Sequence, residues 1–309
     1  MNSTAGKQLE QLETESVSSE GYELDTMTPL QIITAMNEAD RMIPDAIEPH
    51  LSKIAQVAEW GIESVRKGGR IFYCGAGTSG RLGLLDAAEC PPTFGVSPDL
   101  VNGLIAGGDS AFIKAVEGAE DSRELGAQDL KDHDLNRNDL VIGLAASGRT
   151  PYVIGALEYA GSLGCHTAAV SCNKNSEIGK TAQIGIDIET GPEILTGSTR
   201  LKAGTAQKMI LNMISTSIMA GLGKVYGSLM VDVVSTNEKL RNRALRIVMN
   251  AAHTDEETAA KALQEADGSC KTAIVMILEH CGVQEAMDRL EKADGFIRTA
   301  IKESENHGS

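Results

Sequence analysis

The stretch YCGAGTSGRLG, residues 73–83, determines how the rest of the chain is interpreted. An apolar run leads into it and a helix-like run leads out, which is typical of a turn between a strand and a helix. Backbone N–H groups at such a helix start bind anions. Gly75, Gly77 and Gly80 fit the spacing G-x-G-x-x-G, but the next predicted strand ends in IAGG, residues 105–108, without the acidic residue that would bind a ribose. The stretch therefore predicts an anion site and disfavours a dinucleotide.

Short apolar strands alternate with helical runs around this stretch. The predicted strands are Ile71–Cys74, Val101–Ala106, Leu140–Ala145, Thr167–Ser171 and Ile184–Ile188. The predicted helices between them cover residues 81–89, 110–117, 151–163 and 176–182. Such alternation favours a parallel sheet covered on both faces, with ligands at the carboxyl ends of the strands. The sequence thus predicts an α/β fold with a doubly wound, five-stranded parallel sheet.

The remaining segments are predicted to be helical, apart from a polar N-terminus. Residues 1–24 are rich in Ser, Glu and Gln, and we expect them to be mobile. A helix should start at Thr28 with Pro29 in its first turn and run through Met36. A second helix should cover residues 46–65, and a long one residues 199–223, with its apolar stripe in the core or in a dimer interface.

The C-terminal part is expected to form a separate helical region. Residues 254–302 are predicted to fold as three short helices, a UBA-like subdomain, broken at residues 267–268 and 281–282. Thr254 is the predicted cap of the first of these helices, with Glu257 completing a capping box. The expected organisation is a mobile segment 1–24, a helical arm with the sheet domain over 25–225, and a helical region over 226–309.

Composition excludes several classes of function. The net charge is −15, from 28 basic and 43 acidic residues, which argues against binding of nucleic acid. No apolar run approaches the roughly 20 residues of a membrane span. The six cysteines form no C-x-x-C pair and the six histidines show no metal-ligand spacing, so we expect no metal site. Without a secretory leader, the cysteines are expected to be free thiols in the cytoplasm.

Two further stretches repeat the chemistry of the first. Ser147, Gly148 and Thr150 follow the third predicted strand, and Pro151 then opens a helix. Two such turns on neighbouring strands could bind one phosphate, although Ser147 or Thr150 could instead be an ordinary helix cap. The third stretch, TGSTRLKAGT at 196–205, precedes the long helix and adds two cations.

These motifs resemble a known family. The sequences GTSGR and SGRT resemble the sugar isomerase (SIS) domain, a doubly wound, flavodoxin-like domain that binds phosphosugars. More narrowly, GAGTSGRLGLLDAAECPPTFG (75–95), LIAGGDSAFIKAVEGAEDS (104–122), IGLAASGRTPYVIGAL (142–157) and TGSTRLKAGTAQKMILNMISTSIM (196–219) resemble the N-acetylmuramic acid 6-phosphate etherases. The resemblance extends from about residue 25 to residue 300.

The resemblance implies a carbon–oxygen lyase of peptidoglycan recycling. Such an enzyme cleaves the D-lactyl ether at C3 of N-acetylmuramic acid 6-phosphate, giving N-acetylglucosamine 6-phosphate and D-lactate. The resemblance also implies two catalytic glutamates, which are Glu89, as proton donor, and Glu120, as the partner acid/base. The residues expected to bind substrate are Thr78, Ser79, Gly80, Arg81, Ser147, Gly148, Thr150, Ser198 and Lys202.

The residues themselves are compatible with this chemistry. Two carboxylates suffice for elimination and water addition if one is kept neutral while the other is ionised. A straight helix from Ser79 to Glu89 would span about 15 Å, too far for one sugar. We therefore expect a helix that starts late or bends, or a Glu89 that serves a site shared with a neighbouring subunit. Four cations are equal candidates for binding the lactyl carboxylate: Arg81, Arg149, Arg200 and Lys202.

Two other functions share these features. A phosphosugar isomerase would use the same fold and also remove the C2 proton. A non-catalytic regulator similar to the glucokinase regulatory protein would bind phosphosugars without turning them over. Of the three, we expect the etherase, as a homodimer without cofactor.

Overall fold

The computed structural model describes residues 13–114, 116–233 and 238–302 of the chain. It divides into two compact units, each with a hydrophobic core of its own. The first comprises the described residues up to Ala88 together with Pro98–Ser215, and the second comprises Glu89–Ser97 together with the described residues from Thr216 on. Two helices, α5 (Gly77–Phe94) and α10 (Lys202–Gly221), run from one unit into the other.

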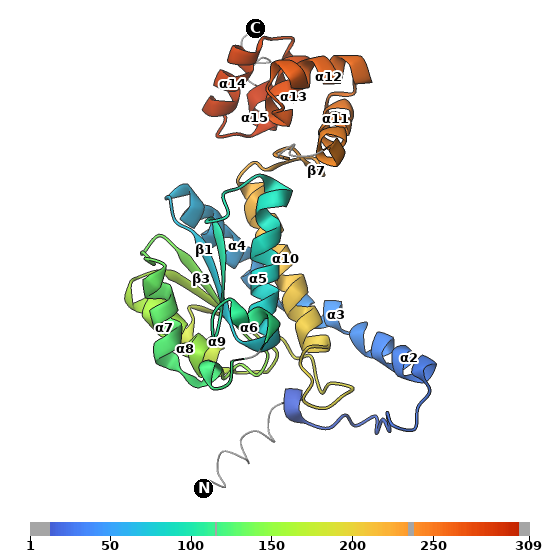
Figure 1. Cartoon of the computed structure of the whole chain (residues 1–309), viewed down its shortest axis with the longest axis vertical. Coiled ribbons are helices and arrows are strands. Elements are labelled where there is room, and N and C mark those ends of the chain that lie inside the picture. Colours follow the sequence, from blue (N-terminus) through green and yellow to red (C-terminus); the bar gives the residue numbers. More distant parts are fainter. Residues whose placement is uncertain (1–12, 115, 234–237, 303–309) are drawn as a thin grey trace. The chain divides into compact units, whose positions relative to one another are not determined.

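A five-stranded parallel sheet forms the centre of the first unit (Figure 1). Its strands are β1 (Ile71–Gly75), β2 (Val101–Ile105), β3 (Leu140–Ala145), β4 (His166–Ser171) and β5 (Ile184–Asp187). The order is β2-β1-β3-β4-β5, so all five predicted strands and the doubly wound fold are confirmed. In this topology the chain changes winding direction between β1 and β3, and such switch points are where ligands bind.

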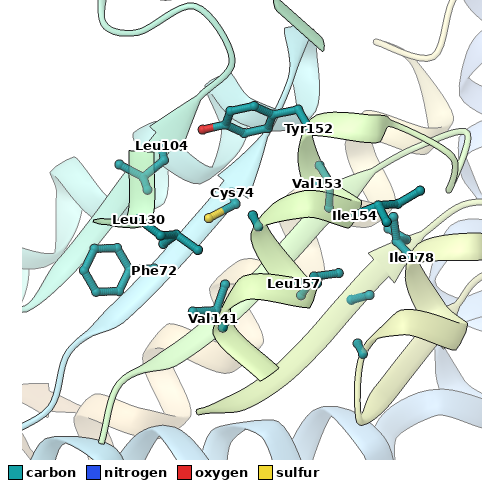
Figure 2. Packing of buried hydrophobic residues seen from close by; sticks show 14 of the residues in the cluster. Phe72, Cys74, Leu104, Leu130, Val141, Tyr152, Val153, Ile154, Leu157 and Ile178 are labelled. Carbon is teal, nitrogen blue, oxygen red and sulfur yellow. The ribbon is translucent and has the colours of Figure 1, made fainter. Parts of the chain in front are cut away.

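Helices cover both faces of the sheet. Those lying wholly in the first unit are α2 (Pro29–Asp40), α3 (Ile43–Ile47), α4 (Leu51–Arg66), α6 (Ser110–Ile113), α7 (Arg123–Asp132), α8 (Pro151–Ser162) and α9 (Glu177–Thr181), with 3₁₀ turns η1 (Glu13–Glu15), η2 (Glu48–His50) and η3 (Ala119–Asp121). Successive strand residues point to opposite faces. Phe72 and Cys74 therefore join the α8 residues Tyr152 and Leu157 in one buried cluster (Figure 2). Tyr73 points the other way, against Gly83 of α5.

The N-terminal helices agree with prediction in part. Thr28 caps α2 in a capping box with Gln31, and Pro29 lies in the first turn as predicted. The helix predicted over 46–65 is confirmed from Leu51 on by α4, but its predicted start is wrong, because Pro49, which has no N–H to donate, lies in η2 between α3 and α4. Within the predicted mobile segment, residues 1–12 lie outside the described residues, whereas Thr14 is buried and its hydroxyl accepts a 2.9 Å bond from Asn173.

Helix α5 is longer at both ends than the predicted helix 81–89. It begins at Gly77 and continues through Pro91 and Pro92 to Phe94. The expectation of a helix that starts late is therefore wrong. The long helix α10 is confirmed within three residues at each end, and α7, absent from the prediction, begins at a Ser122 cap that accepts from the N–H of Leu125.

The second unit is helical with one small hairpin. Its elements are β6 (Val225–Tyr226), β7 (Leu229–Met230), α11 (Glu238–Ala252), α12 (Glu256–Glu265), α13 (Cys270–Glu279), α14 (Val283–Lys292) and α15 (Ile297–Lys302). The two predicted breaks are found, but a third break at Asp294 and Gly295, both at positive φ, gives four helices where three were predicted. The predicted Thr254 cap is wrong, because the Asp255 side chain accepts from the Thr258 N–H at 2.8 Å. No helix in the described ranges has the length and apolar character needed to cross a membrane.

Candidate active site

The turn between β1 and α5 consists of one residue. Ala76 separates the strand end Gly75 from the helix start Gly77, which adopts a positive φ of 52°. The first helical hydrogen bond runs from the N–H of Gly80 to the carbonyl of Ala76. The N–H groups of the helix start before Gly80 have no carbonyl a turn earlier to bond, and they are the donors that an anion can use.

Two glycines hold this helix start against the strand. A Cβ on Gly80 would lie 2.8 Å from the carbonyl oxygen of Gly75 and 2.7 Å from Ile105 Cγ1. A Cβ on Gly75 would lie 2.7 Å from the nitrogen of Gly80. Neither position has room for a side chain, so this close backbone contact places the helix start at the strand end.

Helix α10 lies beside the first turn. The buried hydroxyl of Ser79 donates to Oε1 of Gln207 at 2.8 Å. The Thr78 methyl group is 3.7 Å from where a Gly204 Cβ would be. The structure thus brings the first glycine stretch together with the helix that follows the third stretch.

The second turn lies at the same edge of the sheet. β3 pairs with β1, with Gly75 opposite Leu144. The Ser147 hydroxyl accepts a long, 3.4 Å bond from the Arg149 N–H, and Gly148 has a φ of 72°. Thr150 precedes α8, yet no side-chain cap bond from it is found in the described structure. Capping therefore does not explain the Thr150 hydroxyl.

A cavity of about 130 Å³ opens beside the first turn. It is lined by Ala76, Gly77, Arg81, Ala106, Ala111, Val116, Glu117, Gly118 and Glu120. Glu120 lies in η3 and is exposed. Arg81 donates to the carbonyls of Phe112 and Ala111 at 2.7 and 2.8 Å, so its guanidinium holds α6 against α5. Sequence-distant Glu120 and the helix start of α5 thus share one cavity.

Glu89 lies further along α5 and belongs to the second unit. Its side chain is exposed. Ten residues separate it from Ser79, which is about 15 Å of helix rise. Because the helix does not start late, two of the expected ways for Glu89 to reach the sugar stay as predictions. One is a bend in the helix, and the other is a site shared with a neighbouring subunit.

The third stretch is organised by a residue that the sequence did not single out. Glu193 is buried, and its two carboxylate oxygens accept the N–H groups of Lys202 and Ala203, both at 3.0 Å. Burial raises the pKa of Glu193, while these two N–H bonds act in the opposite direction. The Glu193 carboxylate therefore caps the N-terminus of α10.

The candidate cations differ in their surroundings. Arg149 donates to Glu177 at 3.3 Å, and Arg200 is exposed. Lys202 is buried, with Nζ 3.7 Å from the Met42 sulfur, and lines a cavity formed with residues 18–20 and Tyr22. Ser198, just ahead, is half-buried and its N–H bonds to the carbonyl of residue 195. Lys202 thus faces a different cavity from the one that holds Glu120.

Gln207, which bonds to Ser79 of the first turn, was also missed by the sequence reasoning. It is 1% exposed on the buried face of α10, among the apolar residues Ala203, Ala206, Ile210 and Leu211. A polar residue among apolar neighbours on that helix face was the available signal. Within residues 13–114, 116–233 and 238–302, no group of three or more His, Cys, Asp or Glu is arranged to hold a metal ion.

Family models match the first unit. The glucokinase regulatory protein N-terminal SIS domain matches residues 53–161, and the SIS domain matches residues 125–217. Among solved structures, a phosphoheptose isomerase from Francisella tularensis matches with a TM-score of 0.51 at 20% identity, covering 63% of this chain and all of that chain. This likeness concerns the fold alone. The chain carries a SIS domain.

Curated relatives are much more similar in sequence. A protein from Listeria welshimeri named N-acetylmuramic acid 6-phosphate etherase is 58% identical over 270 residues, 87% of this chain and 91% of the relative. A protein of the same name from Halalkalibacterium halodurans is 55% identical over the same length and the same shares of both chains. The chain belongs to the N-acetylmuramic acid 6-phosphate etherase family.

Proposed function

We propose that the chain cleaves the D-lactyl ether of N-acetylmuramic acid 6-phosphate, releasing D-lactate and N-acetylglucosamine 6-phosphate in peptidoglycan recycling. The observation that carries this function is the 58% identity, over 87% of the chain, with a relative that has this activity in its name. The SIS domain and the glycine turn at the start of α5 support a phosphosugar substrate. The enzyme is a carbon–oxygen lyase.

The reaction needs four proton transfers and one molecule of water. With the sugar open, the C1 aldehyde makes the C2 proton acidic, and a carboxylate removes it. The C3–O bond then breaks, a carboxylic acid protonates the lactyl oxygen, and lactate leaves behind a C2=C3 double bond. Water then adds its oxygen to C3 and gives a proton to the carboxylate that had protonated lactate, while the other carboxyl returns its proton to C2, so both groups regain their starting states. Each acid–base step of this kind contributes about 10²–10⁴-fold.

We assign these roles to Glu89, as proton donor, and Glu120, as the second acid/base. The role of Glu120 is supported by its position in the lining of the cavity beside the start of α5. For Glu89 we propose that it acts in the site of a neighbouring subunit, because about 15 Å of helix rise separates it from Ser79. The phosphate is held by the α5 start with Thr78, Ser79 and Gly80, and by Ser147, Gly148 and Thr150. Arg81, Ser198 and Lys202 complete the proposed substrate-binding set.

A homodimer in the cytoplasm is part of the proposal. Helix α2 buries Ala35 but leaves Leu30 and Ile33 74% and 62% exposed. These two side chains lie three residues apart and therefore on one face of the helix. A second copy of the chain would cover this apolar face.

The test measures D-lactate released from N-acetylmuramic acid 6-phosphate by the wild type, Glu89→Gln, Glu120→Gln and Asp121→Asn. Asp121 is the matched control, because it is an exposed acid next to Glu120 in the same 3₁₀ turn. Release by wild type and Asp121→Asn, with at least about 100-fold less from either Gln variant, supports the proposal. Ketose formation would indicate an isomerase, and binding without turnover a regulator.

A complementation experiment tests the shared site. Glu89→Gln and Glu120→Gln subunits are mixed, unfolded and refolded together, so that mixed dimers form. If one glutamate comes from each subunit, a mixed dimer contains one intact site and one inactive site, and it regains up to about half of the activity of a wild-type dimer. No recovery in mixed dimers would place both glutamates of a site in one chain.

A further inference from the structure

Gln207 has one paired and one unpaired group in its buried amide. Its Oε1 accepts the hydroxyl proton of Ser79 at 2.8 Å. Its Nε2 is buried and has no hydrogen-bond partner in the part of the chain that is described. Leaving a buried donor unpaired is costly, so a native amide in this state is expected to have a partner at some stage of the protein's work.

Packing alone does not account for a glutamine here. The flanking buried residues of α10, Ala206 and Ile210, are apolar. A methionine would fill nearly the same volume as Gln207 without leaving N–H groups unpaired. The amide instead makes a side-chain hydrogen bond to the helix that starts at the proposed phosphate site.

The amide has two orientations with different consequences for Ser79. In the orientation described, the hydroxyl proton of Ser79 is donated to Gln207 and is not available to an anion. When the amide turns over, Nε2 donates to the Ser79 oxygen, and the hydroxyl proton becomes free. A hydroxyl has one proton to donate and two lone pairs, so Ser79 can then accept from Gln207 and donate to an anion together.

We propose that Gln207 is a positioning residue for anion recognition, which acts by setting the direction in which the Ser79 hydroxyl donates. When the phosphate of the sugar reaches the start of α5, the amide turns over, Nε2 gains an acceptor, and Ser79 donates to the phosphate. The inference rests on the proposed function in taking the anion to be a sugar phosphate. Ser79 would contact the phosphate, and Gln207 would act through Ser79.

The experiment compares Gln207→Met, Gln207→Glu, Ser79→Ala and the double variant Ser79→Ala/Gln207→Met. For each, KM and kcat are measured with N-acetylmuramic acid 6-phosphate, and the Kd of inorganic phosphate is measured by calorimetry. Ser215→Ala is the matched control, because Ser215 is also a buried hydrogen-bonding residue of α10, donating to Asp86 at 3.1 Å. Thermal unfolding of every variant separates stability from binding.

We expect Gln207→Met to raise KM and the phosphate Kd about tenfold, because without the Nε2 donor the Ser79 hydroxyl is no longer directed at the anion, with kcat within about twofold. It should have no further effect in the Ser79→Ala background, because Gln207 acts through Ser79. Gln207→Glu keeps an acceptor for the Ser79 proton and lacks the N–H, so it should weaken phosphate binding further. Ser215→Ala should lower the melting temperature and leave KM unchanged.

Several results would overturn the inference. These are an unchanged phosphate Kd in Gln207→Met, an effect of Gln207→Met that simply adds to that of Ser79→Ala, or wild-type phosphate affinity in Gln207→Glu. If Gln207→Met does not fold, the phosphate Kd of the isosteric variant Gln207→Glu decides whether the inference stands. If the wild type binds phosphate but releases no D-lactate, the proposed function fails while the Kd series still tests Gln207.

Discussion

Replacing Gly80 with alanine tests the close contact between β1 and α5. The new Cβ would lie 2.8 Å from the Gly75 carbonyl oxygen, about 0.6 Å short of the 3.4 Å at which ordinary contact begins. The obstructing atom belongs to the backbone of a central strand, so the start of α5 has to move. Overpacking of this kind costs about 1–3 kcal/mol. Alanine in a helix recovers about 1 kcal/mol relative to glycine, so the free energy of unfolding should fall by up to about 2 kcal/mol.

The same displacement should impair substrate binding. If the N–H groups before residue 80 hold the phosphate, moving them by about half an ångström should raise KM about tenfold, since a 1 Å misplacement can cost about 100-fold in rate. Urea unfolding gives the stability change, and D-lactate release at varied substrate concentration gives KM and kcat.

Gly161→Ala is the matched control for this substitution. Gly161 also lies in a helix, α8, has no atom within 4 Å of its would-be Cβ, and does not have a positive φ. This variant should gain about 0.4–1 kcal/mol of stability and keep the wild-type KM. Equal behaviour of the two variants, or an unchanged KM in Gly80→Ala, would refute the assignment of the α5 start as the phosphate site.

Three further outcomes are expected. Thr150→Val should raise KM with little change in stability, because the Thr150 hydroxyl caps no helix in the described structure. As a control, Ser269→Ala removes the α13 cap that accepts from the Thr272 N–H, so it should lower the free energy of unfolding by about 1 kcal/mol and leave KM unchanged. The opposite pattern would show that Thr150 has a structural role. Burial raises the pKa of Glu193, so this carboxyl contributes most stability when protonated, below its ordinary pKa of 4.5, and the contribution is lost as pH rises through the folded pKa. The melting temperature of the wild type relative to that of Glu193→Gln should therefore fall from pH 4 to pH 7. A difference that stays constant over this range would contradict the reasoning. Iodoacetamide should label Cys281 first in the native protein, because Cys281 is the least buried of the six cysteines. Burial raises the pKa of the Cys165 and Cys270 thiols to about 11, which lowers their reactivity. Mass spectrometry that finds Cys74 or Cys172 labelled first would contradict the described packing.

The sheet was predictable from the sequence because its signals are local. Each strand is a short apolar run bounded by turn residues, and every one is found within two residues of its predicted limits. The wrong predictions arise where a local signal competes with its context. Thr254 looked like a cap, yet Asp255, one residue later, has the geometry to accept from the Thr258 N–H. The helix predicted to end at residue 89 continues as α5 through Pro91 and Pro92 to Phe94.

The candidate site was predictable in its loops and not in its long-range partners. A turn of glycine and serine at a strand end carries its own signature, and pairing of β1 with β3 puts two such turns at one edge. The contact between Ser79 and Gln207 joins residues 128 positions apart, which no local pattern can reveal. Glu193, nine positions before Lys202, likewise caps α10 only because the intervening loop folds back.

Helices α5 and α10 are joined at two levels in the first unit. One is the bond between Ser79 and Gln207. The other is Asp86, which accepts from Asn212 at 2.8 Å and from Ser215 at 3.1 Å. Seven residues, about 10 Å of rise, separate Ser79 from Asp86 on α5. A single attachment would let the helices pivot, whereas two resist both rotation and sliding. Ligand-induced adjustment at Ser79 is thereby confined to side chains, and hydrogen exchange along the two helices should slow together when phosphate binds.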